Sequence, residues 1–178
     1  MLKITIPENE FWSERDQEFI HVNETTITLE HSLISLAKWE SRWNKAYLSE
    51  EEKTKEESID YIRCMTTSQN IDPNIYYFLT KKNLDEINNY INLPMTATTF
   101  SEESKPSRKK ITAEIIYYWM ISFNIPMECQ KWHLNRLLTL IRVCSIKNQP
   151  DKKMSSKEIL ERNKRLNAQR KKAMHTKG

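Results

Sequence analysis

Cysteine and histidine are the residues of this 178-residue chain whose side chains most readily do chemistry. Cys129 and His133 are four residues apart, a spacing that places both on one face of a helix. A thiolate activated by histidine is a common nucleophile, but such pairs do not usually lie within one helix, and buried cysteine is common. His21, His31 and His175 have no cysteine or carboxylate at the spacing of a metal site. We therefore expect packed or surface histidines, and keep His133 as a candidate binding residue.

Glycine occurs only at the last residue, Gly178. The GxSxG turn of many hydrolases and the phosphate-binding loops of nucleotide enzymes need glycine for positive φ or close backbone approach. We therefore expect no catalytic residues, no cofactor and no metal in this chain, and predict that it is not an enzyme. Tight β-hairpins also favour glycine, which disfavours a strand-rich fold.

The composition is that of a globular protein on the polar side, with 38% hydrophobic and 29% charged residues. No apolar run reaches the roughly 18 residues that span a bilayer, and charges near the N-terminus do not fit a signal peptide. The three cysteines are odd in number and show no paired spacing. We expect no membrane partner, no disulfide framework and a reducing compartment.

The longest apolar stretch, Ile111–Ile146, predicts the core of a mainly α protein. Residues 115–123 are apolar nearly all round, which is typical of a buried helix with no solvent face. Pro126 suits the first turn of a second helix. That helix has one apolar face, formed at three- and four-residue spacing by Leu134, Leu137, Leu138, Ile141 and Cys144. We therefore expect a buried αα-hairpin over residues 111–149.

Other elements must support this hairpin. Residues 1–29 predict a small β-hairpin, with strands at 2–6, 19–22 and 25–29 and a two-residue turn at Asn23-Glu24. Residues 30–94 predict an acidic helical part. Its expected helices cover about 30–48, 49–65 with Ser49 as N-cap and Glu52 three residues later, a short helix from Asp72-Pro73, and one from Asn83 or Leu84 to Leu93.

Two polar segments complete the predicted organisation. Residues 95–110 form a polar linker, and residues 150–178 form a basic helix or tail, for which Ser155 and Glu158 suggest a capping box. The charge changes sign along the chain: residues 1–104 carry a net charge of −9 and residues 105–178 carry +13. Such asymmetry indicates packing of the two parts on each other, a bound partner, or a basic arm that meets an anion.

Two groups of residues are candidates for binding a partner. The basic segment offers Arg162, Arg165, Arg170 and Lys171, which could neutralise phosphates or dock on an acidic protein. No aromatic residue lies among them to stack on bases, so a protein is the favoured partner and nucleic acid the alternative. The second group could line an apolar groove, although tryptophan is more often core; it comprises Trp39, Trp43, Trp132 and His133, with Trp119 as a further lining residue.

Four segments carry a further signal: ITLEHSLISLAKWESRW, IDYIRCM, ITAEIIYYWMISFNIPMECQKWHLNRLLTLIRVC and ERNKRLNAQRKK. In them the chain resembles a family of bacteriophage proteins that are encoded in the tail-gene module and regarded as tail assembly chaperones. The resemblance extends from about Ile27 to Lys172 and includes no catalytic motif. It implies a helical assembly factor in the host cytoplasm that binds the tape-measure protein, a long helical chain which must stay soluble until tail protein polymerises around it.

Two alternatives stay open beside this interpretation. The chain could be a structural protein of the virion, in the tail or connector, or a nucleic-acid-binding protein that uses its basic C-terminal arm. Self-association is a further expectation that the sequence does not decide.

Overall fold

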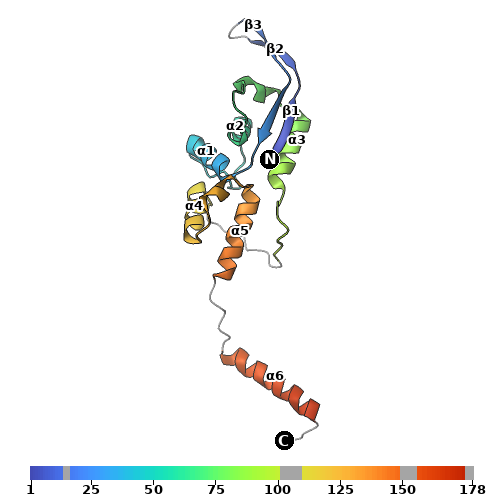
Figure 1. Ribbon diagram of the computed structural model, residues 1–178, viewed down its shortest axis with the longest axis vertical. Helices are drawn as coiled ribbons and strands as arrows, with labels where there is room; N and C mark the ends of the chain where they lie inside the picture. Colours follow the sequence, from blue (N-terminus) through green and yellow to red (C-terminus); the bar gives the residue numbers. More distant parts are fainter. Residues whose placement is uncertain (14–16, 101–109, 149–155, 175–178) are drawn as a thin grey trace. The chain divides into compact units, whose positions relative to one another are not determined.

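A computed structural model describes residues 1–13, 17–100, 110–148 and 156–174 (Figure 1). It confirms the mainly α fold. Contacts divide the chain into two units, Met1–Cys144 and Ser145–Gly178. In order, the elements are β1 (Leu2–Ile6), β2 (Asn9–Ser13), β3 (Glu18–Val22), β4 (Thr25–Leu29), α1 (Leu33–Trp43), α2 (Lys55–Met65), the 3-10 helix η1 (Pro73–Phe78), α3 (Lys81–Asn92), α4 (Ala113–Ser122), the 3-10 helix η2 (Met127–Lys131), α5 (Leu134–Lys147) and α6 (Ser156–Met174).

The N-terminal strands form two antiparallel pairs that share one register. β1 pairs with β4, with Leu2 opposite Leu29, and β2 pairs with β3, with Asn9 opposite Val22. The pairs are therefore successive parts of one two-stranded ribbon, and the β2–β3 part extends beyond the helices (Figure 1). The ribbon is interrupted after β1 at Pro7, which has no N–H to donate to a ladder.

The predicted turn at Asn23-Glu24 is wrong. These two residues connect β3 to β4 along one side of the ribbon, and the chain reverses between β2 and β3 instead. Sequence reasoning missed β2, because its sequence NEFWS begins with two residues that are uncommon in strands.

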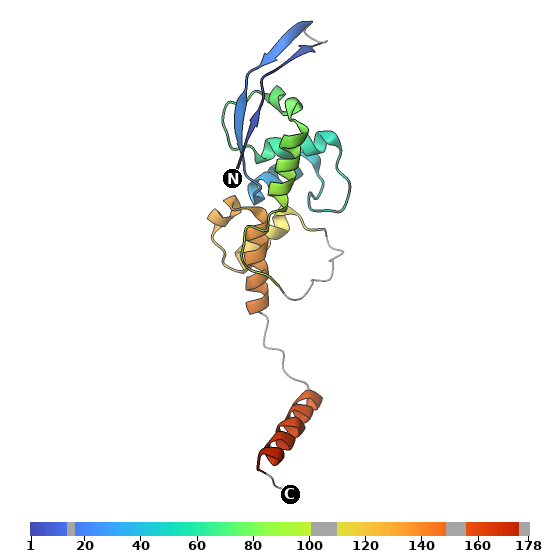
Figure 2. The ribbon, with the colours of Figure 1, turned by 90° about the vertical axis from the view of Figure 1, so that its right-hand side faces the viewer.

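The first of two hydrophobic clusters lies between the ribbon and the helices that follow it. α3 runs beside β1 (Figures 1 and 2), where Asn83 Nδ2 donates to the carbonyl oxygen of Thr5 over 3.2 Å. On the other side, the backbone N–H of Glu30 donates to the carbonyl of Met65 at the end of α2 over 2.8 Å. The buried residues of this cluster include Ile6, Ile27, Leu29, Trp39, Tyr61, Met65, Ile75 and Ile87.

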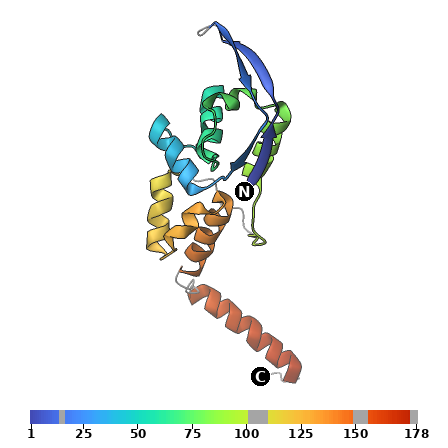
Figure 3. The same ribbon diagram turned by 45° about the horizontal axis from the view of Figure 1, so that its top comes forward.

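The second cluster joins α1 to the predicted central hairpin. Leu33 and Leu36 of α1 pack in it, whereas Trp39 of the same helix belongs to the first cluster. Figure 3 shows α1 between α2 and α4. α1 therefore lies between the two clusters and contributes buried side chains to both. The other buried members are Ala113, Ile116, Met120, Ile125, Cys129, Leu134, Leu137 and Ile141.

Glu40 ties α1 to the start of α4. Its two carboxylate oxygens accept the backbone N–H groups of Ala113 over 2.7 Å and Tyr47 over 2.9 Å. Thr112, the N-cap residue of α4, makes no side-chain capping bond, so Glu40 satisfies this helix terminus from another part of the chain. Burial raises the pKa of Glu40, and the two backbone N–H groups oppose that rise.

Two predicted helix boundaries are corrected. α1 ends at Trp43 rather than near Leu48, because Asn44 takes the left-handed conformation with φ 53°. α2 begins at Lys55, with Thr54 and Glu57 as its capping box, instead of the predicted Ser49 and Glu52. The same capping pattern occurs twice, and the copy used lies one turn before the apolar residues that α2 buries, which begin at Tyr61.

The central hairpin also differs from the prediction, although Leu134, Leu137 and Ile141 form its buried face as expected. Pro126 is the N-cap of η2, and α5 begins eight residues later at Leu134. α4 is not buried all round. It ends where Asn124, with φ 53°, lets the N–H of Ile125 reach the carbonyl of Met120 over 2.8 Å.

The second unit contains α6, a basic helix of 19 residues. Where its side chains are described, they are exposed. The predicted helix is confirmed over Ser156–Met174, while Ser155 and residues 101–109 of the predicted linker lie outside the described residues.

Candidate partner-binding surfaces

The interface of α1 with α2 holds Trp39 and Trp43. Trp39 is 1% exposed, and its indole N–H donates to the carbonyl of Glu57 over 2.8 Å. Trp43 is half-buried and donates to Oδ2 of Asp60 over 3.0 Å. The two rings stack at 6.1 Å. Trp39 is thus a core residue that no partner can reach, and Trp43 is only partly accessible.

Trp132 packs against the second cluster, away from that pair, and His133 follows it in the chain. Trp132 is half-buried, with the guanidinium of Arg136 at 4.2 Å over its ring. It lines an open hollow of about 300 Å³ with Lys131, Arg136, Glu30, Met1, Met95 and His133. The predicted tryptophans therefore do not line one groove, because they divide between the two hydrophobic clusters.

His133 itself is buried, with 6% of its surface exposed. Its Nε2 lies 3.0 Å from the carbonyl oxygen of Tyr90, and its ring is 5.1 Å from that of His31. Burial lowers the pKa of His133. Cys129 lies in η2 while His133 precedes α5, so the two do not share one helical face as predicted.

His31 contacts both His133 and Tyr61, and we call His31 and His133 the buried histidine cluster. Its Nδ1 lies 2.6 Å from the hydroxyl of Tyr61, and only 2% of His31 is exposed. Burial, followed by the nearby His133, lowers the pKa of His31 to about 4. The cluster is therefore uncharged at neutral pH. Among the described residues, no group of three or more His, Cys, Asp or Glu side chains is placed to hold a metal ion.

α4 presents the apolar surface that sequence reasoning missed. Tyr118 is 66% exposed and Ile121 is 67% exposed, although Ile116 and Met120 on the opposite side are fully buried. Glu114 and Ser122 are also exposed and share this face, because residues four and seven apart are neighbours on a helix. We call Glu114, Tyr118, Ile121 and Ser122 the outer face of α4. The polar residues Glu114 and Ser122 were the signal that this side meets solvent.

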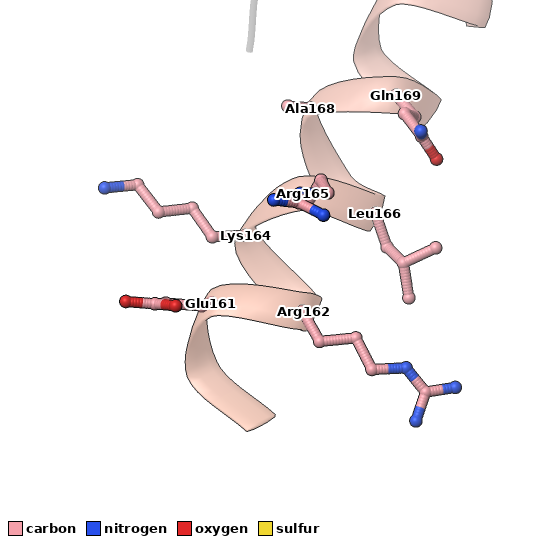
Figure 4. Close-up of a pocket in the computed structure, with 7 residues that line it drawn as sticks. All are labelled: Glu161, Arg162, Lys164, Arg165, Leu166, Ala168 and Gln169. Carbon is pink, nitrogen blue, oxygen red and sulfur yellow. The ribbon is translucent and has the colours of Figure 1, made fainter. Parts of the chain in front are cut away.

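α6 carries the predicted basic candidates Arg162, Arg165, Arg170 and Lys171, all exposed. Figure 4 shows how its side chains spread around the helix: Arg162 and Leu166 project to one side, and Glu161 and Lys164 to the other. Arg162 and Arg165 are three residues apart and therefore neighbours on the helix, whereas Lys171 is about 180° from Arg162 around the axis, so the basic candidates do not form one patch.

In the part of the chain that is described, no helix has the length and apolar character needed to cross a bilayer.

Comparisons with known proteins add nothing to this geometry. No protein-family model, curated protein or solved structure matches the chain.

Proposed function

We propose that this chain is a non-enzymatic assembly factor, similar to bacteriophage tail assembly chaperones, that binds the tape-measure protein in the host cytoplasm. The proposal comes from the resemblance of its four segments to that family. The observation that carries it is the outer face of α4, where Tyr118 and Ile121 are about two-thirds exposed. Large apolar side chains that adjoin each other on a surface are typical of interaction sites.

The outer face suits a helical partner. α4 is held in place by the burial of Ile116 and Met120 and by the Glu40 bond to Ala113, so its opposite side is presented on a fixed backbone. An amphipathic helix can lay its apolar side against such a surface, with contacts repeating every three or four residues. The resemblance implies a partner that is a long helical chain which must stay soluble before assembly, and such a chain would suit this surface.

Co-expression with the tape-measure protein of the same phage tests the proposal. We expect the chain to co-purify with it and to increase its soluble fraction. The double substitution Tyr118→Ser with Ile121→Ser should abolish most of this effect without unfolding the chain. Tyr77→Ser is the matched control, because Tyr77 of η1 is 65% exposed and lies in another element.

Two results would count against the proposal. Absence of co-purification by the wild-type chain would reject the tape-measure protein as the partner. Equal loss of binding with Tyr77→Ser and with the α4 double substitution would reject the outer face of α4 as the site. Mass spectrometry of purified particles separates an assembly factor, which leaves the particle, from a structural protein of the tail or connector, which stays.

A further inference from the structure

The β2–β3 part of the ribbon carries an exposed aromatic pair. Trp12 is 50% exposed and Phe19 is 64% exposed, although the two residues are opposite each other in the register and their rings lie 5.1 Å apart. Residues alternate between the two faces of a strand, and Val22, three residues after Phe19, is buried in the first cluster. The aromatic pair therefore lies on the face that points away from that cluster, where the ribbon extends beyond the helices (Figure 1).

Carboxylates flank this pair. Glu10 lies two residues before Trp12 on the same face, and Glu8 and Glu24 are also exposed. The described residues 7–13 and 17–24 contain four Glu residues and no Lys or Arg. The acidic aromatic face of the ribbon, as we call it, comprises Glu10, Trp12, Phe19 and His21.

The charge of this face disfavours two kinds of partner. Its carboxylates would repel the phosphates of a nucleic acid. The same face of a second copy would bring the carboxylates of one chain against those of the other, and like charges that face each other are destabilising. The face fits instead a surface on which apolar side chains lie between cations.

One side of α6 has this arrangement. The lysine side of α6, as we call it, comprises Lys157, Leu160, Lys164, Ala168 and Lys171. These residues recur at three- and four-residue spacing, so they lie along one side of the helix. Leu160 is 70% exposed, and Figure 4 shows Lys164 and Ala168 on the same side as Glu161. Three lysines against one glutamate leave this side cationic.

We propose that the lysine side of α6 docks on the acidic aromatic face of a second copy of the chain. The spacings along the two elements agree. If Leu160 lies over the aromatic pair, Lys164 is about 6 Å further along α6. Glu10 is about 7 Å from Trp12 along β2, so the two opposite charges meet beside the apolar contact. This self-association needs neither the outer face of α4 nor the tape-measure protein, and it is independent of the proposed function.

Charge reversal tests this contact by sedimentation equilibrium of the purified full-length chain at low salt. We expect the wild-type chain to self-associate. Glu8→Lys with Glu10→Lys should raise the dissociation constant about tenfold or more, and Lys164→Glu with Lys171→Glu should do the same, because each places like charges across the contact. An equimolar mixture of the two variants should associate as the wild-type chain does, since the ribbon of each then meets the α6 of the other with opposite charge.

Two control variants change the charge by the same amount elsewhere. Glu50→Lys with Glu52→Lys alters exposed carboxylates between α1 and α2. Arg165→Glu with Arg170→Glu alters α6 about 100–120° around its axis from Lys164. Each control should change the dissociation constant less than about threefold, because charges away from a contact are screened by solvent and salt.

The remaining outcomes overturn the inference. A wild-type chain that stays monomeric at every concentration has no such contact. If neither reversal weakens association, or if a control weakens it as much as the reversals do, self-association uses another surface. If the mixture of the two reversed variants does not associate, the ribbon and α6 are not each other's partners. All of these results leave the proposed function untouched, since none involves the tape-measure protein.

Discussion

The buried histidine cluster should make this protein sensitive to mild acid. His31 has an ordinary pKa of 6.5, which the fold lowers to about 4, first by burial and then by the neighbouring His133. Below pH 6.5 the unfolded chain binds a proton at His31 that the folded chain does not. The free energy of unfolding therefore falls as the pH is lowered from 6.5 to 4.

The magnitude follows from the difference between the two pKa values. One pKa unit corresponds to about 1.4 kcal/mol, so His31 alone should remove about 2 kcal/mol by pH 5 and about 3 kcal/mol by pH 4. His133, whose pKa is also lowered by burial, acts in the same direction. In the protonated ring Nδ1 of His31 must donate to the hydroxyl of Tyr61, 2.6 Å away.

The assay is urea unfolding of the wild-type chain and of His31→Gln between pH 7.5 and pH 5. Substitution will change stability at every pH, so the informative quantity is the slope of the unfolding free energy against pH. We expect this slope to be smaller in His31→Gln by up to about 1.4 kcal/mol per pH unit.

His21→Gln is the control for this comparison. His21 is half exposed, 3.7 Å from a carboxylate oxygen of Glu8 on the ribbon, and its substitution should leave the slope close to that of the wild-type chain. A slope in His31→Gln equal to that of the wild-type chain would refute the reasoning, because it would mean that His31 titrates alike in the folded and unfolded states.

Two further predictions concern the helices that meet at α4. Glu40→Ala should lower the unfolding free energy by about 3 kcal/mol in urea titrations, because it leaves the N–H groups of Ala113 and Tyr47 without their acceptor; a loss below about 1 kcal/mol would show that water replaces the carboxylate. Met120→Ala should lower the unfolding free energy by about 2–5 kcal/mol, because Met120 is fully buried in the core. Tyr118→Ala should lower it by less than about 1 kcal/mol, because Tyr118 is 66% exposed. Equal losses of stability in thermal unfolding would contradict the assignment of the two faces.

Periodicity predicted which elements are helical more reliably than which side of a helix is buried. In α5 one face is apolar, and the structure confirms Leu134, Leu137 and Ile141 of the predicted face as buried, while Leu138 and Cys144 are half-buried at its margin. In α4 nearly every residue is apolar, and hydrophobicity cannot rank the faces. The neighbours decide instead: the burial of Ile116 and Met120 against α1 and α5 leaves the opposite side to solvent.

Local turn chemistry misled the prediction of the ribbon. Asn23-Glu24 suits a two-residue turn, but that turn would pair β3 with β4. The observed register places Leu29, Ile27 and Ile4 on the buried face of the β1–β4 pair. That face is buried by α2 and α3, which lie far away in the sequence, so a few consecutive residues cannot predict the register.

Only some of the charged residues of the acidic and basic parts form ion pairs in the fold. In the described part of the chain, Arg42–Asp60 and Lys45–Glu57 pair within the acidic segment, and Lys110–Glu51 joins it to the basic one. That last pair is exposed on both sides, and such pairs contribute little stability. Most of the positive charge after residue 104 lies instead on exposed side chains, including those of α6. Folding of the described residues therefore leaves most of these cations in contact with solvent.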